Sequence, residues 1–266
     1  MIRITALKKR FVSGRGARQR SVAAVAGVDF TAADGAITAL LGPNGAGKTT
    51  TLRIAAGLLE ADSGSVVVDG IDVARAPRPA LARMGVLSDA RGLYPRLTAR
   101  ENIVYHGRLQ GLGAAAAEAR ARALAQLLEM EPLLDRRTEG FSQGERMKTA
   151  LARAIVHDPP NIVLDEPTNG LDVLATRSLR AALASLRDAG KCIVLSTHIM
   201  REVPRLADRV VLVARGRTVA AGSVAELCAL AGEGDFEEAF VKLAFGAEDR
   251  AAAGAVPALA SIQVDS

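Results

Sequence analysis

The run Gly42-Pro43-Asn44-Gly45-Ala46-Gly47-Lys48-Thr49-Thr50 has the residue types and the spacing to hold the phosphates of a nucleotide. It follows the apolar residues 36–41, so we expect a strand that leads into a glycine-rich turn and opens a helix. Glycines allow the backbone angles by which successive main-chain N–H groups converge on one anion at the positive end of a helix. Lys48 is expected to reach the β- and γ-phosphates, and the Thr49 hydroxyl to bind Mg²⁺. The alternative is a plain strand-to-helix turn, but the GxxxxGKT pattern is far more restrictive than such a turn requires.

Two adjacent carboxylates, Asp165 and Glu166, form a second candidate site. They directly follow the apolar residues 162–164, which predict a buried strand. Charge at the edge of a dry core demands a partner, and Mg²⁺ is the obvious one. Asp165 would hold the metal directly or through water, and Glu166 would polarise the water that attacks a γ-phosphate. The alternative is a helix N-terminus capped by a carboxylate, although the phosphate loop favours the catalytic interpretation.

The segment Phe141-Ser142-Gln143-Gly144-Glu145 opens a predicted helix and could also meet a phosphate. Ser142 and Glu145 have the S-x-x-E spacing of a capping box, in which each side chain satisfies the other residue's backbone N–H group, and this needs no ligand. Gly144 lowers the helix propensity by about 1 kcal/mol against alanine, which is easier to understand if something approaches the backbone closely. A phosphate at this helix start would meet N–H groups and a hydroxyl together.

The hydrophobic pattern predicts that an α/β fold positions these motifs. A strand-helix-strand order beyond residue 160 argues for a parallel, buried sheet. The predicted elements are strands at 23–30, 36–41 and 66–68 with a hairpin turn at Asp69-Gly70, a helical insert over about 98–157, strands at 162–164 and 192–195 separated by a helix at 173–189, and a final hairpin over 210–220.

Composition narrows the classes of function without selecting one. The 266 residues can bury the core of one large domain, or of a domain with a subdomain. No stretch approaches the roughly 18 apolar residues of a membrane span, and no signal peptide is evident. Two cysteines, Cys192 and Cys228, offer no disulfide framework, which is typical of the reducing cytoplasm. The net charge of +5 comes from scattered arginines, and with no Trp, two Tyr and six Phe a base-stacking surface for nucleic acid is not expected.

The order of the three motifs, followed by Asn169-Gly170-Leu171-Asp172 and Ser196-Thr197-His198, resembles the ATP-binding cassette (ABC) ATPases. The resemblance covers residues from about 4 to 245 and implies a P-loop NTPase cassette. That fold has a mixed, largely parallel sheet core, an antiparallel β subdomain and a helical insert. We therefore expect an ATPase domain at 1–245 with a helical subdomain at about 90–158, followed by a flexible Ala-rich tail at 246–266.

The resemblance also assigns roles to residues. Ser142 and Gly144 would belong to the family's signature sequence, most commonly Leu-Ser-Gly-Gly-Gln, which here reads Phe-Ser-Gln-Gly-Glu. Asp172 resembles the aspartate that crosses the interface between two cassettes, and His198 resembles the switch histidine that contacts the γ-phosphate. Phe11 is the best candidate for the aromatic residue that stacks on adenine, and the alternative is a phenylalanine of the core. The implied cofactors are ATP and Mg²⁺, and the implied catalytic residues are Lys48, Glu166 and His198.

One departure from the family pattern concerns a glutamine that usually follows a strand, touches the metal and the attacking water, and relays closure to the membrane partner. Asp89 occupies this position here. We expect its carboxylate to approach the Mg²⁺ shell and to add favourable negative charge. The alternative is that Asp89 caps a turn and the contact is lost. Residues 88–94 are similar to ATP-binding subunits of sodium-extrusion and related ABC-2-type export systems, which favours an exporter.

The family's mode of assembly implies the partners. Two cassettes dimerise head to tail, so each nucleotide lies between the phosphate loop of one subunit and the signature of the other, and hydrolysis becomes conditional on closure. We expect a second copy of this chain as the dimer partner, and separate membrane-spanning permease subunits docked between the helical insert and the sheet core, at the cytoplasmic face of the membrane. The alternative is a soluble ABC ATPase acting on nucleic acid or ribosomes. One intact cassette without a heptad run favours transport.

Overall fold

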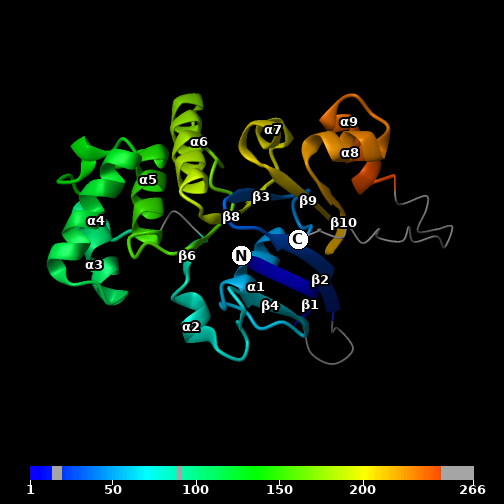
Figure 1. The fold of residues 1–266 in the computed structure, drawn as a ribbon, viewed down its shortest axis with the longest axis horizontal. Helices are drawn as coiled ribbons and strands as arrows, with labels where there is room; N and C mark the ends of the chain where they lie inside the picture. The colour runs from blue at the N-terminus through cyan, green and yellow to red at the C-terminus, as the bar shows by residue number, and fades with distance from the viewer. Residues whose placement is uncertain (14–19, 89–91, 247–266) are drawn as a thin grey trace.

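Helices cover both faces of a ten-stranded sheet in the part of the chain that the structure describes (Figure 1). The computed structural model describes residues 1–13, 20–88 and 92–246. The strands are β1 (Ile2–Ser13), β2 (Arg20–Ala32), β3 (Ala36–Leu41), β4 (Ser63–Val68), β5 (Ile71–Asp72), β6 (Met84–Leu87), β7 (Asn161–Leu164), β8 (Cys192–Thr197), β9 (Arg209–Ala214) and β10 (Arg217–Gly222). The α-helices are α1 (Lys48–Ala55), α2 (Pro77–Leu81), α3 (Ala99–Leu109), α4 (Ala114–Leu127), α5 (Gln143–Ala154), α6 (Val173–Asp188), α7 (Val203–Leu206), α8 (Val224–Ala231) and α9 (Phe236–Ala244). Short 3-10 helices span Glu131–Leu133 and Met200–Glu202.

The sheet consists of a parallel half and an antiparallel half, in the order β5-β4-β1-β2-β10-β9-β3-β8-β7-β6. β6, β7, β8 and β3 pair in parallel, and β9 pairs in parallel with β3. β1 pairs antiparallel with β2 and β4, and β4 with β5 through the predicted turn at Asp69-Gly70. β10 joins the halves, because it pairs antiparallel with β9 and in parallel with β2. The predicted cassette, with a parallel core and an antiparallel β subdomain, is therefore confirmed.

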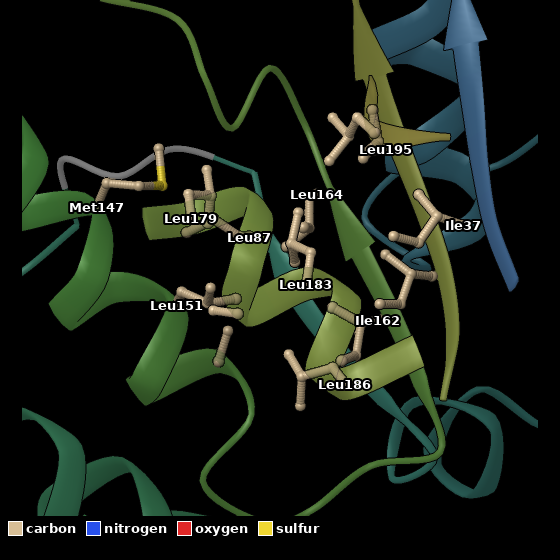
Figure 2. Packing of buried hydrophobic residues seen from close by; sticks show 14 of the residues in the cluster. Ile37, Leu87, Met147, Leu151, Ile162, Leu164, Leu179, Leu183, Leu186 and Leu195 are labelled. Atoms are coloured by element: carbon tan, nitrogen blue, oxygen red, sulfur yellow. The ribbon is translucent and has the colours of Figure 1, made fainter. Parts of the chain in front are cut away.

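The core forms two hydrophobic clusters because successive residues of a strand point to opposite faces of the sheet. In β7, Ile162 and Leu164 belong to one cluster, whereas Val163 between them belongs to the other. Figure 2 shows the first cluster, in which Met147 and Leu151 of α5 face the leucines of α6 and the sheet. α1 contributes Leu52 and Ile54 to the second cluster. Packing against the sheet therefore holds α1 in place, and packing against α6 and the sheet holds α5 in place.

The predicted helical insert is confirmed as α3, α4 and α5, which lie together at one end of the molecule in Figure 1. The hydroxyl of Thr98 accepts a hydrogen bond from the Glu101 N–H in a capping box, which starts α3. Ala117, Ala121 and Ala125 of α4 are buried, so small side chains let the insert pack closely. Within the described ranges, no helix is both long and apolar enough to cross a membrane.

Candidate active site

The phosphate loop joins β3 to α1 as predicted, and its shape depends on glycine. Gly45 and Gly47 have φ angles of +81° and +99°, where residues with a side chain are strained. A Cβ on Gly47 would lie 2.3 Å from the carbonyl oxygen of Ala24, and one on Gly42 would lie 2.1 Å from that of Val213. The loop therefore sits directly against the backbone of β2 and β9.

The loop ends at the start of α1, whose first residues are Lys48, Thr49 and Thr50. The first N–H groups of an α-helix have no partner within the helix, and the N-cap residue Gly47 supplies no side-chain cap to this one. These N–H groups and the helix dipole favour an anion here. The geometry of the turn thus suits a phosphate group, the ligand that the sequence predicts.

The Lys48 ammonium is held inside this loop. Its side chain is 5% exposed, and Nζ donates hydrogen bonds to the carbonyl oxygens of Gly42 (2.7 Å) and Pro43 (3.2 Å). Nζ also lies 3.5 Å from Oε1 of Glu166. A buried charge needs such partners, and here they place a positive group between the loop and the second carboxylate.

Asp165 and Glu166 directly follow β7, and the hydroxyl of Ser196 contacts both residues. Oδ1 of Asp165 accepts hydrogen bonds from the hydroxyls of Thr49 (3.0 Å) and Ser196 (2.6 Å). The same Ser196 oxygen accepts a hydrogen bond from the Glu166 N–H (2.9 Å). Glu166 has a φ of +49°, which a residue with a side chain rarely adopts, so this contact helps to hold a strained backbone. The helix-cap alternative for the two carboxylates is wrong, because α6 begins only at Val173.

The oxygen atoms of Thr49 and Asp165 suit the predicted magnesium ion. Both are hard donors of the kind that Mg²⁺ prefers, and they meet although 116 residues separate them in the chain. The third predicted metal-binding residue, Asp89, lies outside the described residues. Its expected role therefore stays a prediction.

His198 lies next to Glu166, just beyond the end of β8. Its Nδ1 is 2.8 Å from Oε2 of Glu166, whose other oxygen faces Lys48. The two side chains are 36% and 20% exposed, so the pair is open to solvent on one side. The structure therefore brings Lys48, Thr49, Asp165, Glu166 and His198 together at the carboxyl ends of three adjacent parallel strands, the usual place for ligands in such sheets.

The predicted capping box at the start of α5 is confirmed. The Ser142 N–H donates to Oε2 of Glu145 (2.8 Å), and the Glu145 N–H donates to the Ser142 hydroxyl (3.2 Å). A Cβ on Gly144 would lie 3.1 Å from the Cβ of Ala175 in α6. In this structure, Gly144 therefore allows α6 to approach α5 closely.

Ser142, Gly144 and Asp172 form a second group at the adjoining ends of α5 and α6. Asp172 is the N-cap of α6, and its Oδ1 accepts a hydrogen bond from the Ala175 N–H (2.8 Å). The Gln143 amide donates to the Asn169 carbonyl oxygen (2.7 Å) and so ties the two helix starts together. Among the described hydrogen bonds and ion pairs, none links Ser142, Gly144 or Asp172 to the group around Lys48.

Phe11 lies on β1 and is 44% exposed, so the alternative that it belongs to the core is wrong. The Lys9 ammonium lies 5.9 Å from the centre of its ring. An exposed ring leaves a face free for stacking, and its predicted contact with adenine stays a prediction.

Ser196 lies within the candidate site, although no role for it was predicted from the sequence. It is fully buried, and its hydroxyl links the Asp165 carboxylate to the backbone N–H of Glu166. The pairing register of β7 and β8 would have predicted this contact. Leu164 pairs with Leu195, so the next residues, Asp165 and Ser196, must be neighbours.

Comparison with known proteins identifies the family. The family model described as ABC transporter matches residues 25–169, which is more than half of the chain. The chain belongs to the ABC transporter family. It is an ABC ATPase, an ATP-binding subunit of a transporter, as the order of the motifs predicted.

Several relatives of this ABC ATPase are ATP-binding subunits by name. The chain is 41% identical over 228 residues to the ABC transporter ATP-binding protein NatA of Bacillus subtilis (strain 168), covering 85% of this chain and 91% of that protein. It is 40% identical over 205 residues to the Nod factor export ATP-binding protein I of Paraburkholderia xenovorans (strain LB400), covering 77% and 67%. The predicted resemblance to export-type ATP-binding subunits is thus confirmed.

Solved structures agree with the cassette fold. A structure described as the ATP binding subunit of an ABC transporter superposes with a TM-score of 0.78 at 29% identity, over 91% of this chain and 98% of the other. The dimeric bacterial ABC transporter cassette MJ0796 superposes with a TM-score of 0.74 at 24% identity, over 84% and 98%.

Proposed function

We propose that this ABC ATPase hydrolyses Mg²⁺-ATP in a head-to-tail dimer and thereby powers separate membrane-spanning subunits of an exporter at the cytoplasmic face of the membrane. The observation that carries the proposal is the convergence of Lys48, Asp165, Glu166 and His198 beside the phosphate loop. We also propose that the ATPase domain spans residues 1–245, with a helical subdomain at about 90–158.

Nucleotide binding is assigned to the loop and the start of α1. The N–H groups beyond Gly42 would surround the phosphates, and Lys48 would exchange its two carbonyl partners for phosphate oxygens. Thr49 and Asp165 would hold Mg²⁺, which neutralises charge on the transferred phosphoryl group. The exposed ring of Phe11 would stack on adenine.

Hydrolysis is assigned to Glu166, supported by His198. A carboxylate can accept the proton of the attacking water when it lies within hydrogen-bond reach of it. Contacts of Glu166 with Lys48 and His198, and its backbone bond to Ser196, fix the orientation of this carboxylate. Removing the carboxylate while keeping the amide shape would therefore stop the chemistry and leave binding intact.

Dimer formation is supported by the separation of the two groups of predicted residues. Among the described residues, no hydrogen bond or ion pair joins Ser142 or Gly144 to Lys48, so a second copy would be needed to supply them to the nucleotide. Beside Asp172, the side chains of Val173 and Leu174 are 83% and 77% exposed. Closure around the nucleotide would then both complete the site and exclude water.

The transport part of the proposal is supported by the relatives, one of which is named as a Nod factor export ATP-binding protein. The likeness of residues 88–94 to export systems points the same way, with Asp89 proposed in the Mg²⁺ shell. Copies of this chain should therefore co-purify with a multi-span membrane protein from native membranes. Retention on RNA or ribosomes instead would favour the soluble alternative.

The decisive test of the ATPase mechanism is E166Q. This variant should bind Mg²⁺-ATP, stop at the closed state and elute as a dimer in size-exclusion chromatography with light scattering. K48A is the matched comparison, because it should lose affinity for ATP itself and stay monomeric. Preserved turnover in E166Q would refute the role of Glu166, and unchanged ATP affinity in K48A would refute the role of the loop.

A further inference from the structure

One arginine contacts both residues in which the ends of the signature sequence differ from the common form. Nη1 of Arg136 donates to Oε1 of Glu145 at 3.0 Å, and its Cζ lies 5.3 Å from the centre of the Phe141 ring. The other oxygen of Glu145 accepts the Ser142 N–H. Arg136 is itself held in place, because its carbonyl oxygen accepts a hydrogen bond from the first residue of α3, Ala99 (3.0 Å).

Glu145 introduces a negative charge where the common form of the signature has a neutral glutamine. Hydrogen bonds from the backbone and hydroxyl of Ser142, and the nearby Arg136, hold the pKa of the Glu145 carboxyl below its usual range. It is therefore an anion at neutral pH, in the same helix turn as the residues proposed to face a γ-phosphate. Like charges brought together in an interface oppose association.

Stability of the free subunit does not explain the Arg136 contact. The Arg136 side chain is 56% exposed, and ion pairs that are open to water contribute little to folding. The same pair acts more strongly once a second subunit excludes water, because charges interact more strongly in a lower dielectric. The contact therefore matters most at closure.

We propose that Arg136 is a positioning residue for nucleotide-driven closure, which neutralises the Glu145 carboxylate so that the Ser142 turn can face the γ-phosphate of a nucleotide bound to a second copy. This role of Arg136 rests on the proposed function, because it requires the signature turn of one subunit to meet the nucleotide of the other.

The test is a double-mutant cycle of R136A and E145Q, made in the E166Q background so that hydrolysis does not remove the dimer. The readout is the ATP concentration that gives half-maximal dimer formation in sedimentation velocity. R136A should raise this concentration roughly tenfold. The Glu145 charge would then stay unneutralised in the interface, and such a charge weakens association by about a factor of ten or more. In the presence of E145Q, R136A should change it by less than about twofold, because no carboxylate then needs neutralising.

R137A is the matched control, because it removes an equal charge at the next position while Arg136 keeps its contacts with Glu145 and Phe141. It should shift neither background, and the thermal midpoint of the free subunit should be the same in R136A and R137A. An equal shift by R136A in both backgrounds, or no shift in either, overturns this role and leaves the proposed function standing. Failure of E166Q alone to dimerise with ATP overturns both.

Discussion

Replacing Ser196 with alanine removes a hydroxyl that contacts the Asp165 carboxylate and the backbone of Glu166, the two residues proposed to act in metal binding and hydrolysis. The Ser196 hydroxyl is fully buried, donates to Asp165 Oδ1 at 2.6 Å and accepts from the Glu166 N–H at 2.9 Å. Without it, Asp165 keeps only its bond from Thr49 among the described side chains, and the strained backbone of Glu166 loses its anchor. We therefore expect S196A to lower both stability and ATP turnover.

The size of the stability loss follows from the two hydrogen bonds. A bond to a charged acceptor contributes about 1.5–3 kcal/mol, and a buried N–H left without a partner costs about 1–3 kcal/mol. The two effects share one atom and are not additive, so we expect a loss of about 3 kcal/mol in the free energy of unfolding. For a domain of this size, that loss corresponds to a fall of about 6–12 °C in the midpoint of thermal unfolding.

Urea unfolding followed by circular dichroism is the suitable assay, because the chain has no tryptophan to report by fluorescence. T38V is the matched control, since the Thr38 hydroxyl is equally buried but has no hydrogen-bond partner among the described residues. Valine keeps the shape of threonine, so T38V should be neutral or stabilising. A loss in S196A of less than about 0.5 kcal/mol, or one no larger than that of T38V, would refute the reasoning.

The remaining predictions concern the loop, the adenine contact and pH. G47A should unfold at a lower urea concentration than G45A and should lose ATP binding. The added Cβ of G47A would meet the Ala24 carbonyl, whereas the space beside Gly45 is open. Equal urea midpoints for the two variants would contradict this. F11A should weaken ATP binding by about 1–3 kcal/mol and leave tripolyphosphate binding unchanged in calorimetry, while a parallel loss for both ligands would exclude stacking. Burial lowers the pKa of His157 in the folded chain. As the pH falls, the imidazole is therefore protonated in the unfolded chain at a higher pH than in the folded chain. The free energy of unfolding should decrease as the pH drops from about 7 through the ordinary histidine range near 6.5. In H157Q, the free energy of unfolding from denaturation curves should decrease less between about pH 7 and 5.5. The same decrease as in the unmodified chain would show that His157 does not cause it.

Local signals in the sequence predicted the motifs and most of the elements around them. The glycine spacing before Lys48 defined the phosphate loop, and the S-x-x-E spacing from Ser142 defined the cap of α5. Both features depend on residues within a few positions of one another, so their local geometry can be predicted from the sequence alone. The apolar runs predicted the parallel strands for the same reason, since burial on both faces leaves a continuous hydrophobic pattern.

Contacts between distant segments could not be predicted in this way. The bond of Gln143 to Asn169, the contact of Arg136 with Glu145 and the double role of Ser196 depend on how helices and strands pack, which no short pattern encodes. Gly144 shows the limit clearly. Its low helix propensity indicated a close approach to the backbone, but only packing revealed that Ala175 of the same chain makes it.

Subunit mixing tests most directly the claim that each nucleotide is completed by two chains. K48A should fail to bind ATP at its own loop, and S142R should block the signature turn that faces a second subunit, so each variant alone should be inactive. A mixed dimer would contain one intact loop facing one intact signature turn, so ATP-dependent phosphate release should reappear when the two purified variants are combined. A mixture as inactive as its parents, or full activity in either variant alone, would contradict the shared site.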